Sequence, residues 1–96
     1  MKIVNWNKEK AKLIKDTRGI DFDRVAVMIE EKEFLGVYGV PSRPDQKMFV
    51  LDYDDYIVCI PFVENEHEIF LKTAYRNRRL NQGREEMDNE KEKNNS

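Results

Sequence analysis

A run of five residues in the middle of the chain, Tyr56-Ile57-Val58-Cys59-Ile60, constrains the fold most. Its β-branched and aromatic residues favour a strand. Because no polar residue alternates with them, we expect a central strand that is covered on both faces. Pro61 follows at once and lacks a backbone N–H, so we expect the pairing of this strand to loosen there.

Segments of similar composition surround this central strand, which we extend to Val63. Asp54-Asp55 before it and Glu64-Asn65 after it are short links, and strands joined by such links must be antiparallel. Two prolines make the segment from Pro41 to Gln46 a predicted loop. The other predicted strands are Lys2–Trp6, Phe34–Val40, Lys47–Tyr53 and Glu66–Tyr75.

Two helices are predicted between the first strand and the others. The first runs from Lys8 to about Thr17, with Asn7 as its N-cap and Gly19 as its stop. The second follows the N-cap Asp21 and carries apolar residues at core-facing spacing, namely Phe22, Val25, Ala26 and Ile29. The order β-α-α-β-β-β-β predicts an α+β domain in which both helices pack on one face of an antiparallel sheet. The opposite face would be open to a ligand or partner.

A chain of 96 residues is the size of one domain. We assign residues 1–83 to that domain and expect residues 84–96, which are charged and almost without apolar side chains, to be a disordered tail. The single cysteine, Cys59, cannot form an internal disulfide, which favours a reducing compartment. No signal-peptide core or membrane-length apolar stretch is evident, so we expect a cytoplasmic protein that does not enter a membrane.

The charge is unevenly distributed. The net charge is −2, yet residues 1–83 hold 14 basic and 14 acidic side chains, so the tail supplies the whole excess. Between Leu71 and Arg84 the chain has no acid and five basic residues, which are Lys72, Arg76, Arg78, Arg79 and Arg84. A short basic C-terminal segment thus follows the last strand of a neutral domain, and a local field of this kind can attract a phosphate backbone.

Most catalytic constellations are missing from the sequence. There is no Gly-rich phosphate loop, no Cys/His cluster and no nucleophile beside a histidine, so we expect neither a cofactor nor a metal. Strand alternation would place Lys72 on the open face and Ile69, Leu71 and Tyr75 toward the helices. Lysine and arginine can stabilise the charge on a phosphate that is being cleaved without a metal.

Each of these signals also has a simpler interpretation. The basic segment could be a solvated surface or a protein-docking surface. His67, the only histidine, lies near a turn and could be an ordinary surface residue. Trp6 and Cys59 fit a core best, and the tyrosines are commonly sheet-packing residues.

Three segments resemble BrnT-type bacterial toxins: Asn5–Lys10 at the entry to the first helix, Arg18–Phe22 between the helices, and Lys72–Arg79 at the end of the last strand. The resemblance covers roughly residues 2–80. It implies a RelE-like fold, ribonuclease activity that arrests translation, and tight complex formation with a small antitoxin.

The sequence therefore leads us to expect a metal-independent endoribonuclease toxin that a partner antitoxin neutralises in a hetero-oligomer. Lys72 and Arg76 would hold the scissile phosphate, and either His67 or Tyr75 would carry the proton. Arg78, Arg79 and Arg84 would bind RNA at flanking phosphates. The alternative function is a non-catalytic protein-binding module of a transcription-repressing complex.

Overall fold

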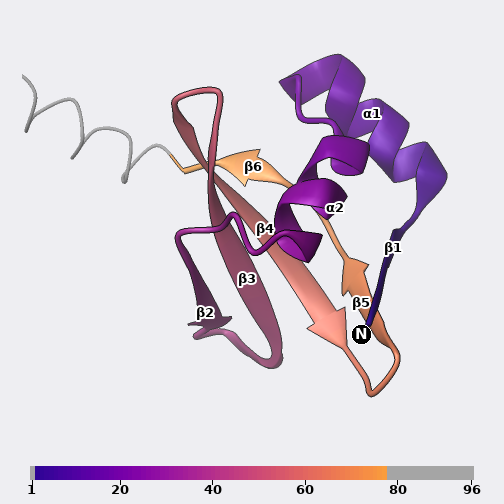
Figure 1. Ribbon diagram of the computed structural model, residues 1–96, viewed down its shortest axis with the longest axis vertical. Helices are drawn as coiled ribbons and strands as arrows, with labels where there is room; N and C mark the ends of the chain where they lie inside the picture. Colours follow the sequence, from indigo (N-terminus) through magenta and orange to yellow (C-terminus); the bar gives the residue numbers. More distant parts are fainter. Residues whose placement is uncertain (1, 78–96) are drawn as a thin grey trace, which may run out of the picture.

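The apolar run of the sequence forms the first half of β4 (Tyr56–Glu64), the central strand of a sheet shown in Figure 1. This computed structural model describes residues 2–77. On one side β4 pairs with β3 (Arg43–Tyr53), and on the other with β5 (Glu68–Leu71) and, further along, with β6 (Tyr75–Arg76). The order β1-β5-β4-β3-β2 leaves β1 (Ile3–Trp6) and β2 (Gly36–Val40) at the edges. The α+β class and the central strand are confirmed.

The expectation of a purely antiparallel sheet is wrong, because β1 runs parallel to β5. The register extends from Ile3 opposite Glu68 to Trp6 opposite Leu71. A short link forces two neighbouring strands to be antiparallel, but both helices and three strands separate β1 from β5, so no link restricts their relative direction. The sheet is mixed, and its parallel pair lies at one edge.

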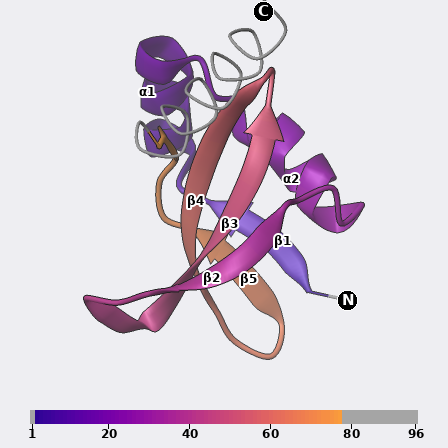
Figure 2. The same cartoon turned by 90° about the vertical axis from the view of Figure 1, so that its left-hand side faces the viewer.

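The two helices have the predicted caps. α1 (Lys8–Arg18) begins after Asn7, whose side chain accepts from the amide of Lys10, and ends at Gly19 in the left-handed region with φ of 69°. α2 (Phe22–Glu30) begins after Asp21, whose side chain accepts from the amide of Asp23. Figure 2 shows α2 beside the strands on the right and α1 at their upper end on the left.

One core cluster lies between the helices and the sheet. The four predicted positions of α2 are buried, and Ile14 of α1 joins them. From the sheet, Phe49 and Phe62 stack with ring centroids 4.2 Å apart. The other buried sheet residues of this cluster are Leu51, Tyr53, Val58, Ile60 and Leu71. A smaller cluster of Val50, Ile57 and Cys59 lies on the opposite face of the sheet, which we call the open face.

The Asp54-Asp55 turn between β3 and β4 is confirmed, with both residues at positive φ (51° and 69°). Aspartate tolerates this region better than most residues because its short side chain can hydrogen-bond locally. Arg24 of α2 donates twice to the carboxylate of Asp54, at 2.8 and 3.0 Å, and its guanidinium lies 4.3 Å above the ring of Tyr53. The turn is thereby joined to α2.

The loop predicted between Pro41 and Gln46 is shorter in the structure. β3 already begins at Arg43, which pairs with Val40 across a register shift next to Gly39. The prolines suggested a longer break, but Pro44 is accommodated inside β3 close to this irregularity, where an N–H need not be donated to the ladder.

The last strand predicted from the sequence is divided into β5 and β6, and Pro61 explains the division. The carbonyl of Pro61 accepts from the amide of Lys72 at 2.8 Å, so the side of Pro61 that lacks an N–H faces this part of the chain. Leu71 is opposite Phe62, but Tyr75 is opposite Cys59, which is a register shift of one residue. Pairing loosens at Pro61, as predicted from the sequence.

Two features complete the description. Within residues 2–77, no helix is long and apolar enough to cross a membrane. The predicted tail, residues 84–96, lies outside the described residues.

Leu51→Ala tests the core. Leu51 is fully buried, so we expect the free energy of unfolding to fall by about 2–5 kcal/mol, from lost burial and the cavity left behind. Leu35→Ala is the matched control, because Leu35 is 61% exposed and should change stability by less than about 0.5 kcal/mol. Urea unfolding measures both, and equal losses would contradict the assignment of the core.

The Arg24–Asp54 pair predicts a pH dependence. The hydrogen bonds from Arg24 hold the pKa of Asp54 below its usual range. A carboxyl group whose pKa is lowered by folding stabilises the protein above its unfolded pKa of about 3.9 and loses that contribution as the pH falls through the folded value. The difference in unfolding midpoint between the wild type and Asp54→Asn should therefore shrink below about pH 4. In an Arg24→Met background, which lacks the donor of these hydrogen bonds, Asp54→Asn should show no such trend.

Candidate functional site

The segment from Lys72 to Ala74 crosses from β5 to β6, and contacts at both ends fix its position. The amide of Lys72 is bound to Pro61, as described above. Arg18, in the last turn of α1, donates to the carbonyl of Ala74 at 2.6 Å, and the side chain of Ala74 is fully buried. The amide of Asn77 donates to the carbonyl of Ile57 at 3.0 Å, beyond β6. These hydrogen bonds fix the backbone that carries the side chains of this segment.

A hollow of about 390 Å³ lies beside this segment on the open face. Figure 2 shows its surroundings from the side: α1 and the tip of the β2–β3 hairpin both project to the left of the sheet, with the segment before β6 between them. The crossing segment contributes Lys72, Thr73 and Tyr75, and α1 contributes Lys10. The hairpin and β4 supply the rest of the lining, which is Val40, Pro41, Arg43, Gln46, Met48 and Pro61.

Among residues 2–77, three cations and no acid line this hollow, which we call the basic hollow. None of Lys10, Arg43 and Lys72 forms an ion pair with any residue between positions 2 and 77. By contrast, Lys2, Lys15, Arg24 and Lys47 each have a carboxylate partner within 4 Å. Like charges that are gathered without counter-charges produce a positive local potential, which suits an anionic ligand.

Tyr75 also lines the basic hollow. Partial burial raises the pKa of Tyr75 above its usual value, and the neighbouring Cys59 raises it further. The phenol is therefore protonated at neutral pH and can donate a proton or a hydrogen bond. Tyr75 is 37% exposed, so a ligand can reach it.

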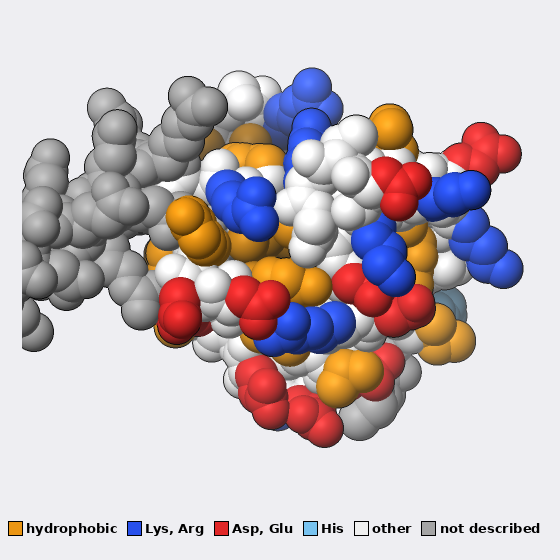
Figure 3. All heavy atoms as spheres, turned by 90° about the horizontal axis from the view of Figure 1, so that it is seen from above, with side chains coloured by type: hydrophobic (Ala, Val, Ile, Leu, Met, Phe, Trp, Pro, Cys, Tyr) orange, Lys and Arg blue, Asp and Glu red, His pale blue; other side chains and the backbone are white. Residues whose placement is uncertain are grey.

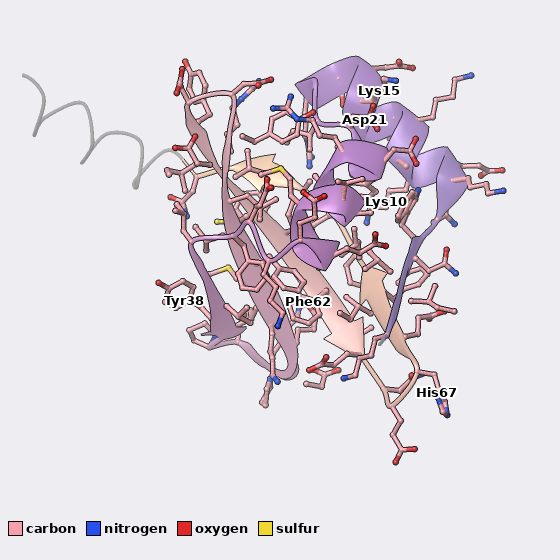
Figure 4. The ribbon with its side chains drawn as sticks, in the orientation of Figure 1. Lys10, Lys15, Asp21, Tyr38, Phe62 and His67 are labelled. Carbon is pink, nitrogen blue, oxygen red and sulfur yellow. The ribbon has the colours of Figure 1, made fainter. Side chains whose placement is uncertain are left out.

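The structure brings together only part of the site that the sequence predicted. Lys72 and Tyr75 both line the basic hollow. Tyr75 was expected to face the helices, but the register shift at Pro61 turns it to the open face. His67 lies in the β4–β5 turn, at the end of the sheet opposite α1 (Figure 4), where its amide donates to the side chain of Asn65.

Arg76 lies on the helix side of the sheet and not beside Lys72. Arg76 is opposite Val58, its guanidinium is 5.1 Å from the ring centroid of Tyr56, and one of its nitrogens lies close to Gly19. The expectation that it shares the face of Lys72 is wrong, because the same register shift exchanges the two faces beyond Leu71. Arg78, Arg79 and Arg84, predicted to bind RNA, lie outside the described residues.

Sequence reasoning missed three residues of the basic hollow: Lys10, Arg43 and Gln46. Lys10 reaches it because β1 pairs with β5, which places the start of α1 next to Lys72. Only the parallel pairing, which the sequence does not reveal, could have linked the two lysines. Arg43 and Gln46 fell in the segment predicted as a loop, and recognising it as the start of β3 would have placed them on the hairpin.

Another hollow, of about 360 Å³ between α1 and the start of α2, is less suited to an anion. Lys8, Lys12 and Lys15 line it, but so do Asp21 and Asp23. Lys15 is already paired with Asp21 at 3.4 Å, and Figure 4 shows the two side chains side by side. Figure 3, which looks onto α1 and the β3–β4 turn, likewise shows acidic and basic side chains mixed over that end of the molecule.

In the part of the chain between residues 2 and 77, no group of three or more His, Cys, Asp or Glu side chains is arranged to hold a metal ion. Comparison of the chain with protein-family models, curated proteins and solved structures found no match in any of the three. We therefore infer the function from the geometry of the basic hollow.

The environment of Tyr75 can be tested by titration. The difference in ultraviolet absorbance between the wild type and Tyr75→Phe should report one phenol that ionises above the usual tyrosine range, because burial disfavours the phenolate. Adding Cys59→Ala to both proteins should reduce but not abolish the shift, since burial is its larger cause. A Tyr75 that ionises at or below the usual value would contradict the described burial.

Proposed function

We propose that this chain is a metal-independent endoribonuclease toxin of the RelE-like type, neutralised by a partner antitoxin, as its resemblance to BrnT-type toxins implies. The observation that carries the proposal is the basic hollow: Lys10, Arg43 and Lys72 stand without ion-pair partners among residues 2–77, and Tyr75, whose phenol is protonated at neutral pH, lines the same hollow. The order of two helices before an otherwise antiparallel sheet is compatible with the proposed fold type. The proposed place of action is the cytoplasm.

Charge and shape both favour a phosphodiester as the ligand. A phosphate group carries a full negative charge in water, and lysine and arginine bind it by charge-assisted hydrogen bonds. The three cations come from α1, the β2–β3 hairpin and the crossing segment, so they surround the hollow from different sides. A ligand phosphate would be held from several directions, which fixes its orientation as well as its position.

The chemistry that fits these groups is transesterification by the RNA's own 2′-hydroxyl. The 2′-oxygen forms a bond to the adjacent phosphorus while the bond to the 5′-oxygen breaks, leaving a 2′,3′-cyclic phosphate and a free 5′-hydroxyl. Lys72 and Arg43 would stabilise the charge that develops on the phosphate oxygens. Tyr75 would donate its proton to the leaving 5′-oxygen, because its phenol is protonated at neutral pH.

The proton of the 2′-hydroxyl would pass to solvent, because none of the described residues that line the hollow is a carboxylate or a histidine. His67, one of the two proton carriers considered from the sequence, has no part in this proposal, because it lies in the β4–β5 turn away from the hollow. Arg76 likewise has no direct role. A mechanism without an efficient general base would be slow.

The experiment that tests the proposal is cleavage of a single-stranded RNA by the purified protein. We expect cleavage in EDTA, with products that end in 2′,3′-cyclic phosphate and 5′-hydroxyl. Lys72→Ala and Tyr75→Phe should each lower the rate by about 100-fold, since each removes a group that acts in the transition state. Lys12→Ala is the matched control: it removes a lysine of α1 that lines the other hollow and should leave the rate unchanged.

Expression without a partner should also arrest growth, and Lys72→Ala should relieve the arrest. Loss of cleavage in EDTA would overturn the metal-free mechanism. Growth arrest with intact RNA would show that the target is not RNA. If Lys72→Ala weakened only the binding of a partner protein, the hollow would be a docking surface, and the protein would fit a non-catalytic module instead.

A further inference from the structure

A second hollow, of about 500 Å³, adjoins the basic hollow along the β2–β3 hairpin. Val40, Pro41 and Gln46 line both, so the two hollows lie next to each other. Its lining is largely uncharged, with Tyr38 and two prolines among its members: Val37, Tyr38, Gly39, Val40, Pro41, Pro44, Gln46 and Lys47. The β2–β3 hairpin thus places a largely uncharged hollow with an aromatic ring next to the positively charged basic hollow.

Tyr38 lines this hollow with an exposed aromatic ring on which a flat ligand can stack. It is on β2, opposite Met48, and so on the open face with the basic hollow. Its ring lies against Gly36, where an added Cβ would come within 2.7 Å of the ring. Glycine at that position lets the ring lie close to the strand backbone, and 54% of Tyr38 remains exposed. Figure 4 shows the side chain directed outward from β2.

Gln46 lies at the junction of the two hollows. No hydrogen bond or ion pair occupies its side-chain amide within residues 2–77. A side-chain amide offers both a donor and an acceptor and can pair with the edge of a nucleobase. Together with the exposed ring of Tyr38, it provides the two contacts by which proteins recognise an unstacked base: a planar surface for the base and a polar group for its edge.

We propose that the second hollow is a nucleobase subsite, in which Tyr38 stacks on a base of single-stranded RNA and Gln46 contacts the edge of that base. The inference rests on the proposed function, because the basic hollow must hold the adjoining phosphate. It narrows the substrate to unpaired RNA, since a base within a duplex cannot leave its stack to lie on Tyr38. Tyr38 contributes binding and Gln46 contributes base preference; neither moves a proton.

The probe is a single-stranded 2′-O-methyl RNA of eight nucleotides, which cannot be cleaved because its 2′-oxygens are blocked. Its abasic counterpart keeps every phosphate. Tyr38→Ala should weaken binding of the base-containing probe by about tenfold, the size expected for one base stacked on an aromatic ring. Tyr38→Phe should retain the wild-type affinity, and binding of the abasic probe should not change in either variant.

Tyr56→Ala is the matched control. Tyr56 is 48% exposed, similar to Tyr38, but it lies beside Arg76 on the helix side of the sheet. The Tyr56→Ala variant should bind both probes as the wild type does. Gln46→Leu should make the affinities for the four homopolymer probes converge, because the remaining stacking contact is tolerant of base identity. Circular dichroism of each variant separates loss of contact from loss of fold.

The outcomes distinguish this inference from the function on which it rests. If the wild type cleaves RNA but Tyr38→Ala binds the base-containing probe normally, the subsite is wrong and the proposed function stands. If Tyr38→Ala weakens both probes equally, the ring does not recognise a base, and the inference is again wrong. If the wild type neither binds a probe nor cleaves RNA, the proposed function fails, and the inference fails with it.

Discussion

The missing N–H of Pro61 is the constraint on which the arrangement of the open face depends. A regular strand after Leu71 would have continued pairing with β4, but Pro61 offers only a carbonyl on that side, which the amide of Lys72 uses. The chain gains one residue relative to β4 before β6 forms. This single residue exchanges the faces of everything that follows, so Tyr75 reaches the open face and Arg76 the helix side.

The pairing of β1 with β5 is the second determinant, because it makes α1 part of the same surface. Parallel pairing places the start of α1 beside the end of β5, where Lys10 approaches Lys72. At its other end, α1 holds the crossing segment through the hydrogen bond from Arg18 to Ala74. One helix therefore supplies a cation to the basic hollow and fixes the backbone that carries Lys72 and Tyr75.

The sequence predicted well those features that local physics determines. α2, its cap and its buried face follow from periodicity, and the Asp54-Asp55 turn follows from two apolar strands with a short polar link. The alternation of side chains along a strand predicted the wrong face for Arg76. It assumes that the pairing with β4 is unbroken, whereas the size of a register shift is set by the partner strand. Lys10 and Arg43 could not be assigned to the hollow, since their proximity to Lys72 comes from pairings between segments far apart in the chain.

The basic hollow carries an electrostatic cost that an anionic ligand would remove. Lys10, Arg43 and Lys72 repel one another across it, and no carboxylate of the described part of the chain lines it to offset that repulsion. Elsewhere the same chain places carboxylates beside cations, as at Lys2 and Lys47, which share Glu64. Acids were thus available to the chain but do not line this hollow. A ligand that binds only the folded state and neutralises these charges would stabilise the fold by mass action, so binding and folding reinforce each other at this site. Because residues 1–83 as a whole hold equal numbers of basic and acidic side chains, the attraction is local and directed to one place rather than spread over the surface.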